Sequence, residues 1–432
     1  MAMRARFLKT RYGGYFHREV PDEDVELTHV GPGTPGGEYL RRFWQPVCFS
    51  DDLGESPLKV KILDEELVAF RNKSGAAGLL ELHCPHRGTS LEFGLIGDTG
   101  IRCCYHGWLF GADGAILETP GEPADSTLKE RLFHGAYPIH EYGGIVFAYM
   151  GPPEGKPPFP AYDTFTRPGY RMIPGRKWIY PCNWLQIMEN TMDPAHTAFL
   201  HTIVAGAVFT EEFGVLPELE FVETPIGMIY IATRRVGDNL WARMVEAVLP
   251  NLQQVAPTWE DGKREIPFSG PMMSRWNLPI DDTHTMFIEF RYVCDTDDRV
   301  TPAWWADRTM LAGQVAAPSY EEGQLHPGDY EAQVSQRPIA VHGLEHLGAT
   351  DRGITMFRNQ LRRGIRAVQA GEDPPGIYRD ADAGGMIATY CNNTVVHLPA
   401  PSDATADRKL MRETGRRLAR SYLAAPPLMA GR

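Results

Sequence analysis

The sequence predicts two domains, an all-β domain followed by an α+β domain that is built around an antiparallel sheet. The 432 residues exceed what one hydrophobic core usually serves. Residues 59–150 show short strand patterns and tight turns without a helical period, whereas long strand patterns and separate helical periods follow residue 160. Residues 151–160 are dense in proline and glycine, which indicates a domain boundary or a rigid crossover between the two parts.

The part before this boundary is expected to hold an N-terminal segment and the all-β domain. We place the N-terminal segment at residues 1–45, packed on the second domain, and the all-β domain at residues 46–155. In chain order we expect a glycine- and proline-rich loop, an apolar-aromatic stretch, a strand–turn–strand unit and a hairpin, at residues 31–37, 40–47, 67–83 and 108–117.

The second domain is expected over residues 156–432. Its clearest strand patterns cover residues 228–234, 240–249 and 284–293. Its clearest helix should begin at Thr350 or Asp351 and end near Gly371. The apolar stripe that predicts this helix consists of Ile354, Phe357, Leu361, Ile365 and Val368.

Composition and charge argue against several classes of protein. A net charge of −12, without a stripe rich in lysine and arginine, argues against a nucleic-acid-binding protein. The longest apolar run, around residues 145–150, is too short to cross a bilayer, and residues 1–20 lack the apolar core of a signal peptide. We therefore expect a cytoplasmic protein that binds neither nucleic acid nor membrane.

The seven cysteines are odd in number and spread along the chain, so they do not indicate a disulfide framework. We expect most of them to be ordinary buried thiols in a reducing compartment, namely Cys48, Cys104, Cys182, Cys294 and Cys391. Cys84 and Cys103 differ because each stands close to a histidine.

These two cysteines belong to loops that carry the first metal-binding pattern. The loops read Cys84-Pro85-His86-Arg87-Gly88 and Cys103-Cys104-Tyr105-His106-Gly107-Trp108. If the loops face each other, Cys84 and Cys103 can hold one iron of a [2Fe–2S] cluster while His86 and His106 hold the other. The glycines and Pro85 permit tight turns that point main-chain N–H groups at the bridging sulfides.

The two loops resemble the Rieske [2Fe–2S] signature in ligand types, spacing and flanking residues. A mixed Cys/His zinc site is the alternative interpretation. Zinc sites more often use paired Cys-x-x-Cys and His-x3-His arms, so the pattern favours the cluster. Arg87 and Trp108 flank the ligands, where they can support a cluster by hydrogen bonding and packing or have a purely structural role.

A second pattern, Asp193-x2-His196-x4-His201, lies in the second domain. If this stretch is helical, Asp193 shares a face with His196 and can hydrogen-bond its ring; the alternative role for Asp193 is a cap next to Pro194. His201 needs a helix end or a local widening to reach the same ion. Two imidazoles and a distant carboxylate form the facial triad of non-haem Fe(II) oxygenases, although two histidines five apart are usually plain core or surface residues.

With both patterns in one chain, the sequence resembles the α-subunits of Rieske non-haem iron aromatic-ring-hydroxylating oxygenases, in particular the phthalate dioxygenase-like members. The likeness runs from residues 27–35 through both patterns to residues 345–348. It implies an all-β Rieske domain and an α+β catalytic domain of the helix-grip, START-like type. It also implies two cofactors, a Rieske [2Fe–2S] cluster and a mononuclear Fe(II) held by His196 and His201.

The third iron ligand is not fixed by chemistry alone. The carboxylates in range are Asp295, Asp297, Asp298, Asp307, Glu321, Glu322, Asp329 and Glu331. Residues 328–336 are similar to the ligand-bearing stretch of the family, and this resemblance selects Asp329.

The resemblance also implies the reaction and its partners. It predicts a terminal oxygenase component that takes electrons from an NAD(P)H-dependent reductase, with or without a ferredoxin. The component would use O2 to mono- or cis-dihydroxylate a small aromatic substrate. It further implies a head-to-tail homotrimer or a dimer of trimers, in which Asp193 bridges His196 of its own subunit and His106 of the next, and this makes Asp193 a catalytic candidate.

Two alternatives to ring hydroxylation stay open. O- or N-demethylation, or another ether cleavage, would use the same metal centres. An electron-transfer protein or sensor would need only the first domain of about 100 residues, whereas about 270 residues follow the boundary here.

The substrate is not defined by the sequence. Residues 203–209 and the aromatic side chains Trp241, Trp276 and Phe287 would suit an apolar aromatic substrate, but they can equally be core. A substrate with a carboxylate would need an inward arginine. The candidates are Arg235, Arg243, Arg275 and Arg291, whose alternative role is in solvent-facing salt bridges.

Overall fold

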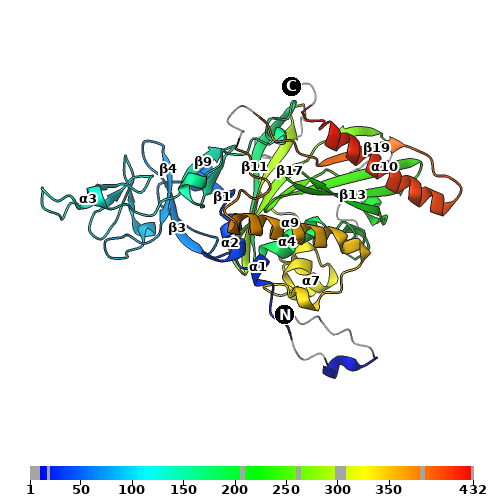
Figure 1. Ribbon diagram of the computed structural model, residues 1–432, viewed down its shortest axis with the longest axis horizontal. Coiled ribbons are helices and arrows are strands. Elements are labelled where there is room, and N and C mark those ends of the chain that lie inside the picture. The colour runs from blue at the N-terminus through cyan, green and yellow to red at the C-terminus, as the bar shows by residue number, and fades with distance from the viewer. Residues whose placement is uncertain are drawn as a thin grey trace.

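The computed structural model describes residues 10–16, 20–204, 210–258, 264–296, 308–379 and 385–429. Within these residues, three small antiparallel sheets lie in the first part of the chain and one large antiparallel sheet lies in the rest. Figure 1 shows the small sheets to one side of the large sheet, with long helices packed on the large one. The predicted all-β and α+β parts are both present.

Short strands and tight turns build the first part, as predicted. One small sheet contains β2 (Leu58–Ile62), β3 (Glu65–Arg71) and β4 (Ala77–Glu81). Another contains β5 (Leu95–Ile96), β6 (Ile101–Arg102), β7 (Leu109–Phe110) and β8 (Ile116–Glu118). The predicted hairpin is the β7–β8 pair. One apolar core, which includes Val68, Phe110 and the side chains of Cys84 and Cys103, joins the two sheets.

A third small sheet connects this part to the rest of the molecule. It contains β1 (Trp44–Phe49), β9 (Ile139–Tyr142) and β10 (Ile145–Tyr149), in the order β1-β10-β9. Strand β1, which is buried along its whole length, also contacts β17 of the large sheet. The apolar-aromatic stretch predicted at residues 40–47 therefore begins at the end of α2 and continues into the buried strand β1.

The large sheet has the order β11-β18-β17-β15-β14-β13-β12, and β14 also pairs with β19, which pairs with β16. Its strands are β11 (Tyr170–Tyr180), β12 (Glu218–Thr224), β13 (Gly227–Val236), β14 (Asn239–Val248), β15 (Leu252–Val255), β16 (Ile266–Ser269), β17 (Met273–Asp281), β18 (His284–Cys294) and β19 (Asn392–His397). The three predicted strands coincide with β13, β14 and β18.

Helices cover both faces of this sheet. In chain order the α-helices of the described residues are α1 (Val25–Thr28), α2 (Pro35–Leu40), α3 (Leu128–Arg131), α4 (Trp184–Thr191), α5 (His196–Ala198), α7 (Tyr320–Leu325), α8 (Asp329–Val334), α9 (Arg352–Gln369) and α10 (Ala404–Ala424). Of these, α3 lies beside β8 in the first part of the chain, away from the large sheet (Figure 1). Side chains of β13 alternate between the faces: Met228 and Tyr230 share a core with α4 and α9, whereas Ile229 and Ile231 pack with α10.

Helix α9 confirms the helix predicted from residue 350 or 351. Phe357, Leu361 and Ile365 of the apolar stripe are buried. Asp351 is the N-terminal cap residue, but its carboxylate accepts from the main-chain N–H of Gly348 at 2.7 Å rather than from the first turn of the helix. The helix packs against α1 and α2, so the N-terminal segment lies on the helices of the second part.

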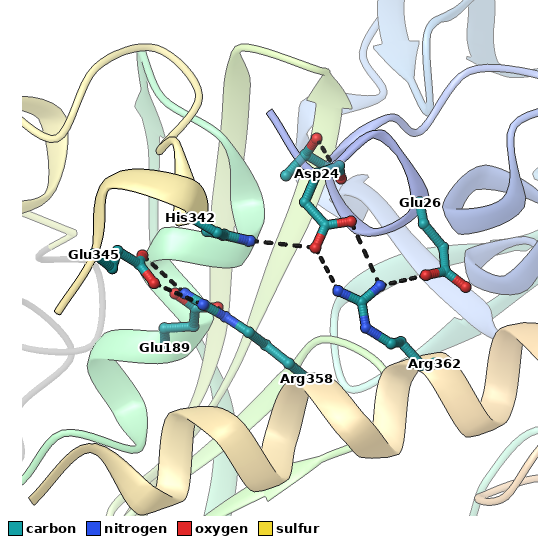
Figure 2. Close-up of polar contacts among 8 residues, drawn as sticks. Asp24, Glu26, Glu189, His342, Glu345, Arg358 and Arg362 are labelled. Atoms are coloured by element: carbon teal, nitrogen blue, oxygen red, sulfur yellow. Dashed lines mark hydrogen bonds and ion pairs between the residues drawn. The ribbon is translucent and has the colours of Figure 1, made fainter. Parts of the chain in front are cut away.

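A network of charged side chains fastens α1, α4 and α9 together (Figure 2). Arg358 of α9 donates to the carboxylates of Glu189 and Glu345 at 2.5–2.9 Å. One turn further along α9, Arg362 pairs with Asp24 and Glu26. Because Glu189 lies near the end of α4, this network fixes the helix that leads into the second metal-binding pattern.

Two of the predicted buried thiols differ in the structure. Cys104 is exposed because the turn of its loop points it away from Cys103, and Cys294 at the end of β18 is only half-buried. Cys48, Cys182 and Cys391 are buried, as expected. None of the helices among the described residues has the length and hydropathy needed to span a membrane.

Candidate metal centres and substrate cavity

The two cysteine–histidine loops have the same main-chain geometry. In the first, the N–H of Cys84 donates to the carbonyl of Thr89 at 2.9 Å, and the N–H of Gly88 donates to the carbonyl of Cys84 at 2.8 Å. In the second, Cys103 donates to Trp108 at 2.8 Å and Gly107 donates to Cys103 at 3.1 Å. Gly88 and Gly107 both have φ near +75°, which a glycine adopts without strain. The two loops therefore form the same type of turn.

The side chains of these loops are arranged as a histidine-ligated cluster requires. The thiols of Cys84 and Cys103 are buried, each only 3% exposed, whereas His86 is exposed and His106 half-buried. The two imidazole rings lie with their centroids 4.4 Å apart. Two inward sulfur atoms and two outward imidazoles on facing loops fit a [2Fe–2S] cluster with its histidine-bound iron toward the surface.

Main-chain N–H groups already point at the sulfur of Cys84. Burial raises the pKa of this thiol to about 11, while the N–H groups of His86 and Arg87 act in the opposite direction and Cys103 adds to the rise. Such N–H groups stabilise a thiolate, so the loop is prepared for a sulfur that loses its proton on cluster binding.

Aromatic and cationic side chains surround the two imidazoles. The ring of Trp108 stacks on His86 with centroids 4.8 Å apart and an interplanar angle of 2°. Tyr105 lies against His106 at 3.8 Å, and the guanidinium of Arg87 lies over the Tyr105 ring at 5.6 Å. The ring of Trp108 packs directly on a candidate ligand, whereas the guanidinium of Arg87 lies over Tyr105, which in turn lies against His106.

The second pattern converges with Asp329. His196, His201 and Asp329 place one ligand atom each within 4.8 Å of the other two. The Nε2 atoms of His196 and His201 lie 3.7 Å and 3.4 Å from Oδ1 of Asp329. Ligands that share one ion at about 2.1 Å lie about 3 Å apart, so a small closure would seat a metal ion here. Of the eight carboxylates considered from the sequence, Asp297, Asp298 and Asp307 lie outside the described residues. Among the other five, Asp329 is the one that the structure brings to the two histidines.

A local widening of the helix brings His201 into the site, as the spacing predicted. Helix α4 ends at Thr191, the short α5 starts at His196, and a π-helical turn follows at Phe199–Val204. A π turn has i→i+5 hydrogen bonds, so residues five apart face the same side. The rings of His196 and His201 accordingly meet with centroids 5.2 Å apart.

Asp193 lies between α4 and α5 rather than on a helix, which corrects the expected geometry. Its carboxylate accepts from the main-chain N–H of Ala195 at 3.1 Å, the capping role considered as the alternative. The Nδ1–H of His196 donates to the main-chain carbonyl of Asp193, and the carboxylate lies 3.7 Å from that nitrogen. Asp193 therefore fixes the tautomer of His196 and leaves its Nε2 facing Asp329.

The surroundings of Asp329 keep it ionised. Burial alone would raise the pKa of this carboxyl group, which is 8% exposed. The hydrogen bond with His201 and the charges of the two imidazoles outweigh burial and lower the pKa, and Gln314 contributes a further hydrogen bond. The Nδ2 of Asn190 lies 3.4 Å from Oδ1. An ionised, buried carboxylate beside two imidazoles is a suitable donor set for Fe(II).

A cavity of about 720 Å³ opens beside this triad. Because alternate residues of a strand face the same side, one face of the large sheet supplies most of its floor. The residues in question are Tyr230 of β13, Arg243 and Val245 of β14, Gln253 and Val255 of β15, Met273 and Arg275 of β17, and Phe287, Glu289 and Arg291 of β18.

The predicted cavity residues divide into two groups. Phe287, Arg243, Arg275 and Arg291 line the cavity. Trp241 and Trp276 lie in apolar clusters elsewhere, and Arg235 pairs with Asp407 of α10. Of the apolar stretch considered as a wall, residues 205–209 lie outside the described residues.

The cavity arginines have unlike partners. Arg291 lies 3.2 Å from the buried carboxylate of Glu289, so its charge is compensated. Arg275 lies over the ring of Phe287 at 4.6 Å. Arg243 is only 6% exposed and donates to the hydroxyl of Tyr230 and, at 2.8 Å, to the carbonyl of Ala256. In the described part of the chain no carboxylate pairs with Arg243, and its Nε has no hydrogen-bond partner.

A second group with metal-ligand side chains, Glu189, His342 and Glu345, belongs to the charged network. Arg358 donates to both of its carboxylates. This compensation gives the group a structural role that needs no metal ion.

Sequence reasoning missed the side chains that hold Asp329. Asn190 lies three residues before Asp193, so a search of the α4 face would have found it. Gln314 comes from a loop without a pattern, and only the three-dimensional structure brings it to Asp329.

Comparisons with known proteins agree with these two centres. Residues 43–136, which include both loops, match the family described as the Rieske [2Fe-2S] domain. The chain is 41% identical to the oxygenase subunit of tert-butanol monooxygenase / tert-amyl alcohol desaturase of Aquincola tertiaricarbonis, over 94% of this chain and 90% of that protein. It is 40% identical to the α-subunit of phenoxybenzoate dioxygenase of Ectopseudomonas oleovorans, over 86% and 92% of the two chains.

A more distant relative and a solved structure extend the comparison. The oxygenase subunit of phthalate 4,5-dioxygenase of Pseudomonas putida is 31% identical, over 83% of this chain and 88% of that one. The crystal structure of dicamba monooxygenase bound to dicamba has a TM-score of 0.58 at 19% identity, covering 77% of this chain and 99% of that one. At this identity the structural likeness concerns the fold.

Proposed function

Because the chain belongs to the Rieske non-haem iron oxygenase α-subunits, we propose that it is a terminal oxygenase that oxidises a carboxylate-bearing aromatic substrate. It is an oxygen-incorporating oxidoreductase that carries a Rieske [2Fe–2S] cluster and a mononuclear iron. The zinc interpretation of the loops is therefore wrong. The electron-carrier alternative fails as well, because the oxygenase relatives match along both parts of the chain.

We assign Cys84, His86, Cys103 and His106 to the cluster and His196, His201 and Asp329 to the iron. The buried thiols and outward imidazoles support the first set, and the 4.8 Å grouping of ligand atoms supports the second. When bound, the cluster supplies single electrons and the iron activates O2. The protein fixes the tautomer of His196 and keeps Asp329 ionised.

Arg243 is the observation that carries the substrate class. A guanidinium that is 6% exposed, without a carboxylate partner among the described residues, leaves a buried positive charge uncompensated. Such a charge is costly unless an anion pairs with it. Since Arg243 lines the same cavity as the iron triad, the carboxylate of a substrate can supply the missing charge.

The rest of the cavity suits the ring of such a substrate. Val245, Val255, Met273 and Phe287 offer apolar contacts on the same face of the sheet as Arg243. A volume of about 720 Å³ accommodates a substituted aromatic acid. A carboxylate at Arg243 would fix one end of the molecule and hold its ring between the arginine and the triad.

Removing the charge of Arg243 should abolish the preference for acids. The assay pairs an aromatic acid with its methyl ester in the purified oxygenase, with a generic reductase and NADH, and measures substrate-dependent O2 uptake together with product. For Arg243→Met we expect kcat/KM for the acid to fall about 100-fold or more while that for the ester changes little. The control is Arg171→Met. Arg171 lies on β11, pairs with Asp295 and does not line the cavity. Equal losses for acid and ester, or none, would contradict the assignment of the substrate class.

The same assay separates the possible reactions. Ring hydroxylation and O- or N-demethylation use the same two centres, so the side chains around the substrate decide between them. Product analysis distinguishes a hydroxylated ring from released formaldehyde.

We further propose that the oxygenase works as a head-to-tail trimer with an NAD(P)H-dependent reductase in the cytoplasm, where NAD(P)H is available. Electrons come to such an oxygenase component from a separate protein. The carboxylate of Asp193 is 30% exposed and lies on the side of His196 that faces away from Asp329. It is therefore accessible to the half-buried His106 of a second copy, and it would bridge the two imidazoles.

A further inference from the structure

The two oxygen atoms of Asp329 have different surroundings. Oδ1 faces both candidate imidazole ligands, at 3.7 Å from His196 and 3.4 Å from His201. Oδ2 accepts a hydrogen bond from the side-chain amide of Gln314. Oδ1 is therefore presented to the metal site, with only the long 3.4 Å contact from Asn190, while Oδ2 is held by the amide of Gln314.

The loop that carries Gln314 is fixed from several sides. The hydroxyl of Tyr180, which is 1% exposed, donates to the main-chain carbonyl of Gln314 at 2.6 Å. The main-chain N–H of Tyr330 donates to the carbonyl of Gly313 at 3.0 Å. These contacts leave the amide of Gln314 little freedom to move away from Asp329.

A pair of glycines lets this loop reach the start of α8. A Cβ on Gly328 would lie 2.2 Å from the Cα of Gly313, so no larger residue fits at that position. Gly328 directly precedes Asp329, and the loop is consequently tied to the main chain that positions the carboxylate.

We propose that Gln314 is the positioning residue of the iron carboxylate. Its amide holds Oδ2, so that Asp329 would offer only Oδ1 to an iron ion at this site. Hydrogen bonds from such partners orient a metal-binding carboxylate, and their loss typically weakens metal binding about 10- to 100-fold. This inference rests on the proposed assignment of Asp329 as an iron ligand.

The test uses the full-length, cluster-loaded protein with Co(II) in place of the mononuclear iron. Competition with a chelator measures Co(II) affinity, and X-ray absorption at the cobalt edge counts oxygen ligands without interference from the cluster iron. For Gln314→Leu we expect an affinity about 10- to 100-fold weaker and one additional oxygen ligand, because Oδ2 becomes free to bind. The matched control is Gln324→Leu, an exposed glutamine of α7, which should leave both values unchanged.

Other variants keep the test decisive. Cluster absorbance reports whether each variant folds. If Gln314→Leu does not fold, Gln314→Met removes the amide donor with an unbranched side chain of similar length and should also weaken Co(II) binding. Wild-type affinity and an unchanged cobalt edge in a folded variant would overturn the proposal. Asp329→Asn distinguishes a failure of the Gln314 proposal from a failure of the ligand assignment. Wild-type Co(II) affinity in that variant would show that Asp329 is not a metal ligand.

Discussion

At the scale of single residues, two buried carboxylates of the second part have pKa values that are shifted in opposite directions. Asp329 faces two imidazoles, and these lower its pKa against the effect of burial. Glu246 of β14 is fully buried and pairs with no cation among the described residues; burial raises its pKa to about 8, with the nearby Asp163 adding to the rise. Glu246 accepts hydrogen bonds from the main-chain N–H of Tyr390 at 2.7 Å and from the hydroxyl of Thr224 at 3.1 Å.

The raised pKa of Glu246 predicts how stability changes with pH. The neutral acid contributes stability that is complete below the ordinary pKa of 4.5 and is lost as pH rises toward 8. Glu246→Gln cannot ionise, so between pH 6 and pH 8 the wild type should lose about 2 kcal/mol more of its free energy of unfolding than the variant does. Urea unfolding at both pH values measures this difference, with the exposed Glu223→Gln as control. Parallel pH dependence of wild type and Glu246→Gln would show that Glu246 is ionised when folded.

The candidate metal ligands could be predicted from the sequence, whereas the residues that surround and position them could not. Cysteine–histidine spacing named the four cluster ligands, and family resemblance selected Asp329 from eight carboxylates. Their roles stay predictions until metal binding is measured. Gln314 matters because it contacts the carboxylate of Asp329, and Arg243 matters because no carboxylate among the described residues pairs with it. Neither relation can be read from the local sequence.

At the scale of elements, the two candidate histidine ligands of the mononuclear iron lie where regular helix geometry is interrupted. Helix α4 ends at Thr191, and the π turn Phe199–Val204 turns His201 toward His196. The five-residue spacing predicted such a widening. The same spacing rule failed for Asp193, because it assumed an unbroken helix at a point where Pro194 interrupts it.

Arg358 is the residue that holds α4 to α9. It serves two carboxylates, one of which, Glu189, is 6% exposed. Arg358→Met leaves both carboxylates without a partner, and breaking a buried pair in this way costs about 3–5 kcal/mol. Arg363→Met, the control, removes an exposed pair with Glu223 on the same helix and should cost less than about 1 kcal/mol. Thermal unfolding of both variants checks the difference, and equal small losses would mean that the network does not hold α4.

At the scale of the whole molecule, the alternation of short and long strand patterns predicted the two-part architecture. The strands around the cluster loops stay in small sheets, and the catalytic cavity uses one face of the large sheet. The domain boundary at residues 155 and 156 stays a prediction. The substrate cavity could not be predicted, because its lining comes from seven strands, several helices and the loop of Gln314, which meet only after folding.

The cluster loops and the iron triad lie in different parts of the chain. In the proposed head-to-tail trimer, the cluster of one copy therefore passes electrons to the iron of the next copy. Co-expression of two inactive variants tests this claim directly. Cys103→Ser loses the cluster, and His201→Ala loses the mononuclear iron. When equal amounts of the two variants assemble at random into head-to-tail rings, about one quarter of all junctions join an intact cluster to an intact iron site, so about a quarter of wild-type activity should return. Mixed oligomers without activity, although each variant retains its other metal centre, would contradict the account.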